Sequence, residues 1–171
     1  MRKIIISTGT LALVATLGAL AAGQVAQSAT RTNATVALHK TGLGAVLVSK
    51  SGRTLYLFGR DRNGKSACSG SCAAYWPPLL SQGKATAGPG VKASLLATTR
   101  RANGTLQVTY NRHPLYTYVL DKGAGQTTGE GVSAFGAKWY AVSAKGTAIV
   151  RAQGTPTTTT PTTSTPYPTY P

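Results

Sequence analysis

Short apolar stretches alternate with glycine- and asparagine-containing turns through the middle of the chain. Alternation with a period of two indicates β-strands, because successive side chains of an extended chain point to opposite faces. Between the two halves of this pattern only Cys72 to Trp76 could form a helical turn. The pattern therefore predicts an all-β domain, with strands over residues 35–39, 45–49, 54–59, 95–99, 105–110, 114–119, 138–143 and 147–151.

Short polar turns join most of these strands in pairs. Lys50-Ser51-Gly52 separates the second strand from the third, and Asn103-Gly104 is a strong hairpin signal. Asn111-Arg112-His113 and Ala144-Lys145-Gly146 are the other two short turns. Strands joined so closely pair in antiparallel fashion.

A motif of the form Tyr-x-aromatic-x-x-Asp occurs twice, sixty positions apart, as Leu55 to Asp61 and again as Leu115 to Asp121. The similarity extends upstream at the same offset, and downstream the offset slips by three at a tryptophan. Such self-similarity indicates an internal repeat. We predict two tandem β units, about residues 42–82 and 102–145, related by a pseudo-twofold within one compact domain. The candidate motif residues are Tyr56, Phe58, Asp61 and Trp76 in the first unit, and Tyr116, Tyr118, Asp121 and Trp139 in the second.

The two ends of the chain differ from its middle. A basic start, an apolar run and small residues predict a signal peptide over residues 1–28, with a retained membrane anchor as the alternative. No cysteine lies directly after the apolar run, so no lipid anchor is expected. Residues 29–34 are predicted to be a flexible lead into the domain at 35–152. Residues 153–171 are rich in Thr and Pro and predict a disordered tail, either a glycosylated spacer or an end without a role.

The charge is strongly one-sided: 18 Lys and Arg against three acidic residues. Such a surface attracts polyanions, although a positive charge can also simply keep a secreted domain soluble. Beyond the predicted signal peptide the basic residues are scattered, with only Arg100 and Arg101 adjacent, and no nucleic-acid-binding motif is present. We expect weak, salt-sensitive contacts with anionic cell-wall or surface polymers and no specific nucleic acid. The sequence identifies no protein partner.

Cys68 and Cys72 are the only cysteines and lie in a Ser- and Gly-rich loop. In an exported protein an even cysteine count favours a disulfide. The alternative is a redox or metal-handling pair, for which His39 and His113 are the only histidines. No cofactor is expected.

The sequence contains none of the usual arrangements of catalytic residues. The acids are Asp61, Asp121 and Glu130, and no Ser-His-Asp arrangement or phosphate-binding glycine loop is present. The two aspartates occupy equivalent repeat positions just after a strand, where a carboxylate can accept backbone N–H bonds from the following turn. We therefore expect both to be structural and equally costly to replace, with Tyr56 and Tyr116 packed beneath the same turns.

The run from Gly44 to Asp61, followed by Ser66-Ala-Cys68-x-x-x-Cys72-Ala-x-x-Trp76-Pro77-Pro78, resembles a bacterial secreted-repeat family of predicted lipoproteins with a Tyr-x-aromatic-x-x-Asp motif. The resemblance covers about residues 42–145, but the second copy lacks the cysteines. The family has no known function. The resemblance implies a secreted or cell-envelope protein, which we interpret as a non-catalytic binding or structural module. An extracytoplasmic redox or metal-handling protein is the alternative.

Overall fold

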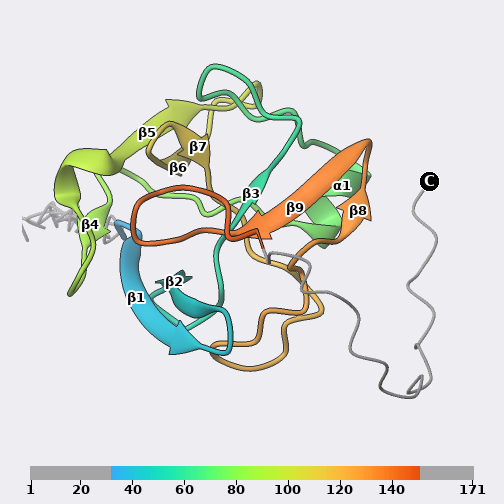
Figure 1. The fold of residues 1–171 in the computed structure, drawn as a ribbon. Helices are drawn as coiled ribbons and strands as arrows, with labels where there is room; N and C mark the ends of the chain where they lie inside the picture. The colour runs from blue at the N-terminus through green and yellow to red at the C-terminus, as the bar shows by residue number, and fades with distance from the viewer. Residues whose placement is uncertain (1–31, 151–171) are drawn as a thin grey trace, which may run out of the picture. The chain divides into compact units, whose positions relative to one another are not determined.

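The computed structural model describes residues 32–150, and the predicted signal peptide and the whole of the predicted tail lie outside them. The domain is built mainly from strands with a single short α-helix (Figure 1). The elements are β1 (Thr35–Thr41), β2 (Gly44–Ser49), β3 (Tyr56–Phe58), α1 (Ser71–Tyr75), β4 (Thr86–Ala87), η1 (Ala93–Leu95), β5 (Leu96–Arg100), β6 (Leu106–Tyr110), β7 (His113–Pro114), β8 (Ser133–Ala134) and β9 (Ala137–Ala141). The all-β prediction is confirmed, and α1 is the helical turn anticipated near Cys72.

The strands form three small sheets with the orders β2-β1-β4, β3-β9-β8 and β5-β6-β7. β1 and β2 pair in antiparallel fashion, as do β5 and β6, so each repeat starts with one hairpin. In the described part of the chain, no helix is long and apolar enough to cross a membrane.

Three predicted strands, over residues 54–59, 114–119 and 147–151, are much shorter than expected, and the second is reduced to β7. Along the first of them the chain changes partners. The Leu55 N–H donates to Leu47 O at 2.8 Å, whereas the N–H of the next residue, Tyr56, donates to Tyr116 O at 2.8 Å. Residues 54–59 therefore form only a three-residue strand, β3. Within the described residues 147–150 no strand forms, but single backbone hydrogen bonds remain, such as Ile149 N–H to Ala141 O at 2.9 Å.

The two repeats match in their hydrogen bonds, but with one shift from the sequence alignment. Leu47 N–H donates to Val142 O and Val108 N–H donates to Leu79 O, both at 2.8 Å. Val108 is thus the counterpart of Leu47, an offset of 61, rather than of Val48. The difference arises in the hairpin turns, which hold three residues between Ser49 and Arg53 but only two between Tyr110 and His113. The shorter turn places Asn111 and Arg112 at φ 47° and 65°, the left-handed values of a tight two-residue hairpin.

The repeats exchange their later strands. β3 of the first repeat pairs with β9 of the second, with Phe58 opposite Trp139 (Figure 1). Conversely, Thr117 N–H of the second repeat donates to Pro77 O of the first at 2.9 Å. At the centre the two motif tyrosines bond each other through their backbones, at 2.8 and 3.0 Å. Each repeat therefore completes the sheet of the other.

The alternation along β3 divides the core into two clusters. Tyr56 and Phe58 face one cluster, which contains the tryptophans and the cysteines, whereas Leu55 and Leu57 face a mainly aliphatic one. Successive side chains of a strand point to opposite faces, so a single short strand contributes to both clusters. The six aromatic motif residues all lie in the aromatic cluster.

Candidate functional site: crossed tyrosine–aspartate pairs

Four aromatic rings of the two motifs form one continuous stack in the aromatic cluster. Their order is Phe58, Trp139, Trp76 and Tyr118, with neighbouring ring centroids 4.1, 4.0 and 4.0 Å apart and interplanar angles of 10°, 3° and 16°. The pseudo-twofold axis passes between the two tryptophans, because the rings on either side of it occupy equivalent positions in the two repeats. All four side chains are at most 2% exposed.

The two motif tyrosines stand edge-on against this stack. Tyr56 meets Trp76 at 5.4 Å and 80°, and Tyr116 meets Trp139 at 5.1 Å and 87°. Edge-to-face contact is a favoured aromatic geometry, since the positive ring edge meets the negative face. Each tyrosine thus packs against the tryptophan of its own repeat, which leaves its hydroxyl pointing beyond the stack.

Each of these hydroxyls bonds to the aspartate of the other repeat. Tyr56 OH donates to Asp121 Oδ2 at 2.7 Å, and Tyr116 OH donates to Asp61 Oδ2 at 2.8 Å. The motif Tyr-x-aromatic-x-x-Asp therefore encodes a pair that no single repeat can make by itself. The sequence analysis placed these residues at equivalent positions but missed the exchange, because pairing across repeats depends on the strand swap.

The second oxygen of each aspartate organises the turn that follows it. Asp61 Oδ1 accepts Ala67 N–H at 2.8 Å. Asp121 Oδ1 accepts both Thr128 N–H at 2.9 Å and Thr128 Oγ1 at 2.6 Å. Both oxygens of each carboxylate are therefore engaged by the protein, and Asp121 is fully buried. Bonding to turn N–H groups is the geometry on which the expectation of a structural role was based.

The pairs are electrostatically perturbed by their burial. Burial raises the pKa of Asp61 to about 6, against the opposing effects of the Ala67 N–H, the Tyr116 hydroxyl and the nearby Arg101 and Arg62. Burial, together with the partner carboxylate, also raises the pKa of both tyrosines well above the ordinary value. The tyrosines therefore stay protonated and act as donors. Because Tyr56, Tyr116 and both tryptophans are 0% exposed, a substrate has no access to their functional groups.

We predict an unusual pH dependence from Asp61. Its pKa rises from 3.8 to about 6 on folding, so the folded state holds this proton more tightly than the unfolded state. The stabilisation is fully present below about pH 4 and is lost as the pH rises through 6. The free energy of unfolding of the wild type, minus that of Asp61→Asn, should therefore increase from pH 7 to pH 4 in urea titrations. A decrease over this range would show that the folded protein prefers the ionised carboxylate.

The two halves of the site differ around the disulfide. Cys68 and Cys72 are joined with an S–S distance of 2.00 Å, and both are buried. In the second repeat, Trp139 Nε1 donates to Ala134 O at 3.4 Å, whereas buried Trp76 Nε1 has no partner. The disulfide-linked helix α1 precedes Trp76 where β8 precedes Trp139, and it uses backbone carbonyls for its own bonds. The disulfide loop thus replaces an equivalent strand.

A chain of hydrogen-bonded polar groups links the Tyr116–Asp61 pair to the disulfide loop. Tyr116 OH also bonds Ser66 Oγ at 2.8 Å, and Ser66 Oγ accepts Arg101 Nη1 at 2.9 Å. Arg101 further donates to Gln107 Oε1 at 2.6 Å and to Cys68 O at 2.7 Å. On the opposite side, Tyr56 OH accepts only a backbone group, Gly129 N–H at 3.2 Å.

Within residues 32–150, no group of three or more His, Cys, Asp or Glu side chains is placed to hold a metal ion. His39 lies on β1 and His113 on β7, while the cysteines are already joined to each other. Burial lowers the pKa of His113, which lines a hollow of about 350 Å³ together with Asp61 and Arg112. Both oxygens of Asp61 are engaged as described above, so this hollow has no carboxylate oxygen without a partner.

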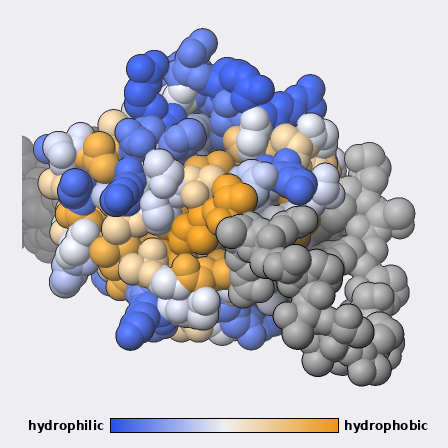
Figure 2. Space-filling model, viewed as in Figure 1, coloured by the Kyte–Doolittle hydropathy of each residue, from blue (hydrophilic) through white to orange (hydrophobic). Residues whose placement is uncertain are grey.

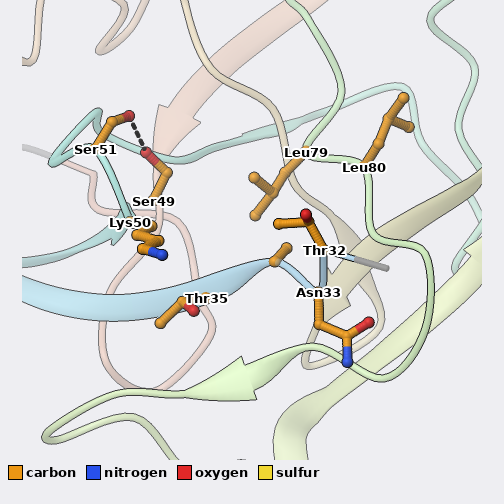
Figure 3. A pocket seen from close by; sticks show the side chains of 9 residues that line it. Thr32, Asn33, Thr35, Ser49, Lys50, Ser51, Leu79 and Leu80 are labelled. Atoms are coloured by element: carbon orange, nitrogen blue, oxygen red, sulfur yellow. Dashed lines mark hydrogen bonds between the residues drawn. The ribbon is translucent and has the colours of Figure 1, made fainter. Parts of the chain in front are cut away.

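A second hollow lies where the chain enters the domain (Figure 3). It has a volume of about 350 Å³ and is bordered by Leu79, Leu80 and the turn in which Ser49 and Ser51 hydroxyls bond at 3.0 Å. Lys50 is the only charged residue among those lining it. This hollow ends at Thr32, at the limit of the described chain.

Comparison with known proteins identifies both repeats. A family model described as a secreted repeat of unknown function matches residues 37–80 and 97–143. The two matched segments coincide with the two structural units that exchange strands. No curated protein and no solved structure matches the chain.

Proposed function

The chain belongs to this family of secreted repeats, and we propose that it acts outside the cytoplasm as a non-catalytic module that binds anionic polymers of the cell wall or surface. One observation carries the proposal: within residues 32–150, every exposed charged side chain is positive. Twelve Lys and Arg residues are exposed, namely Lys40, Lys50, Arg60, Arg62, Lys65, Lys84, Lys92, Arg100, Arg112, Lys122, Lys138 and Lys145.

The acidic residues offset little of this charge, because Asp121 is buried, and Asp61 and Glu130 are half-buried and bonded within the domain. Asp61 and Asp121 form the crossed pairs, and Glu130 Oε2 accepts Ala141 N–H at 2.7 Å. A surface with one sign of charge creates a field that concentrates polyanions. Hydrophilic residues gather in particular over the loops above β5, β6 and β7 (Figure 2).

The closed aromatic core supports a binding rather than a catalytic assignment. Its tyrosines and Asp121 are fully buried, and their functional groups are bonded to one another. Such a core holds the two repeats rigidly and thereby fixes the spacing of the surface cations. The disulfide fits the same structural task, since it closes a short loop and so stabilises the fold by about 2 kcal/mol.

Binding should be measurable and strongly dependent on salt. We expect the folded domain to bind inorganic polyphosphate or poly(glycerol phosphate) at 50 mM salt, with the affinity falling as salt screens the charges over about 10 Å at 0.1 M and 3 Å at 1 M. Isothermal titration calorimetry across this range measures the effect, with uncharged dextran as the control polymer. Failure to bind any polyanion at 50 mM salt would refute the proposed function.

A further inference from the structure

We infer that the hollow beside the Cys68–Cys72 loop is the site at which this protein binds a phosphate group of an anionic polymer that carries no nucleobases. The inference rests on the proposed function and assigns it a place. The hollow has a volume of about 510 Å³ and lies between the disulfide loop of the first repeat and the β5–β6 turn of the second. Three cations line it: Lys65, Arg100 and Arg101.

These cations come from both repeats and are the densest basic group on the lining of any hollow described above. Arg100 and Arg101 are adjacent at the end of β5, and Lys65 projects from the turn after Asp61. Lys65 and Arg100 are exposed. Of the Arg100 guanidinium, only Nη1 has a bond within the described chain, to Gly104 O at 2.7 Å. Ammonium and guanidinium groups arranged in this way suit a phosphate oxygen cluster.

Three hydrogen bonds to other parts of the domain hold the Arg101 guanidinium in place. Its three bonds, to Ser66 Oγ, Gln107 Oε1 and Cys68 O, leave it half-buried at the wall of the hollow. Gln107 is fully buried, and its Nε2 donates to Leu115 O at 2.9 Å. The strand bridges make Gln107 the counterpart of Val46, because Gln107 lies opposite Leu80 as Val46 lies opposite Ser143.

The second repeat therefore has a polar residue in the core where the first repeat has valine. A buried amide is costly unless its bonds are satisfied, and here one of those bonds holds Arg101. The chain Asp61–Tyr116–Ser66–Arg101 connects the same arginine to the crossed pair. Asp61 lies near enough to interact with Arg101 but already accepts bonds at both oxygens. Lys65 and Arg100 are thus the cations left to meet a ligand directly, with Arg101 as their fixed support.

The lining also indicates the class of polymer. It contains serine, glycine, alanine and Asn103 besides the cations and Cys68, but no aromatic side chain. Binding of single-stranded nucleic acid generally uses aromatic rings on which bases stack. A site of cations and hydroxyls without rings recognises the charged backbone alone, as in a poly(glycerol phosphate) or polyphosphate chain.

The test compares two double variants that remove the same charge. Lys65→Gln/Arg100→Gln alters the hollow, and Lys40→Gln/Lys145→Gln removes two exposed lysines that do not line it. Calorimetry with poly(glycerol phosphate) at 50 mM salt should show at least about a tenfold weaker affinity for the first and less than about threefold for the second. The slope of log affinity against log salt should fall by about 1.5 in the first, at roughly 0.7–0.9 for each lost phosphate contact. Equal thermal stability of the two variants shows that both remain folded.

Each alternative result has a distinct meaning. Equal losses in the two variants would overturn the site and leave the proposed function, since the general field would then carry binding. An absence of binding by the wild type would overturn the function itself. A thymidine oligonucleotide of equal charge should bind no more tightly than the polymer. Tighter binding of the oligonucleotide that is lost in Lys65→Gln/Arg100→Gln would overturn the base-free assignment.

Discussion

Replacing Trp139 by alanine is expected to lower the free energy of unfolding by about 4 kcal/mol, within the usual range for a buried aromatic deletion. Trp139 lies inside the four-ring stack, packed between Phe58 and Trp76, and Tyr116 meets it edge-on. The substitution would remove three aromatic contacts at once and leave a cavity at the centre of the domain.

The matched variant Trp76→Ala breaks the same stack, but it should lower the free energy of unfolding by about 1 kcal/mol less than Trp139→Ala does. Trp76 Nε1 is buried without a hydrogen-bond partner, so removing it also relieves the free-energy penalty of an unsatisfied buried donor. Trp139 Nε1, by contrast, donates to Ala134 O. Leu80→Ala serves as the surface control, because this side chain is 47% exposed. Urea unfolding measures all three variants, and a Trp139→Ala cost similar to that of Leu80→Ala would contradict the importance of the stack.

Replacing Asp121 by asparagine is expected to cost about 3 kcal/mol, and Asp61→Asn about 1 kcal/mol at neutral pH. Asp121 is fully buried and accepts three bonds, from Tyr56 OH, Thr128 N–H and Thr128 Oγ1. An asparagine amide would face the tyrosine hydroxyl with a donor, and the hydroxyl would lose its acceptor.

Asp61 is less buried and accepts two bonds rather than three, so its replacement leaves fewer donors without an acceptor. The sequence analysis expected equal effects because the two sites are equivalent by repeat, and the structure replaces that expectation with an unequal one. Chemical denaturation at pH 7 compares the two variants. A cost for Asp61→Asn equal to or above that for Asp121→Asn would show that burial does not set the difference.

The sequence revealed the repeat and its strands because both depend on local patterns. Alternation around Tyr56 and Phe58 identified β3, and the recurrence at Tyr116 and Asp121 identified the second unit. The shift of register upstream was not visible, because Val48 and Val108 align by identity while the one-residue difference lies in the turns. Matching identical residues does not reveal that one hairpin turn is a residue shorter than the other.

The crossed pairing and the hollow could not be predicted for a different reason. Tyr56 and Asp121 are brought together only by the exchange of β3 and β9 between repeats, which is a tertiary event. Gln107 gave no signal in the sequence, because residues 106–110 alternate apolar and polar side chains as a half-exposed strand does, although Gln107 is fully buried. Its partner Arg101 lies only six positions away, although the contribution of the disulfide loop is not encoded locally.

The central claim is that each motif tyrosine is paired with the aspartate of the other repeat, and a double-mutant cycle tests it most directly. Tyr56→Phe and Asp121→Asn should be coupled by about 1–3 kcal/mol in the free energy of unfolding, because their side chains share a hydrogen bond of 2.7 Å. Tyr56→Phe and Asp61→Asn, which lie in the same repeat and share no hydrogen bond, should be additive to within about 0.5 kcal/mol. Strong coupling within the repeat and additivity across the repeats would contradict the account.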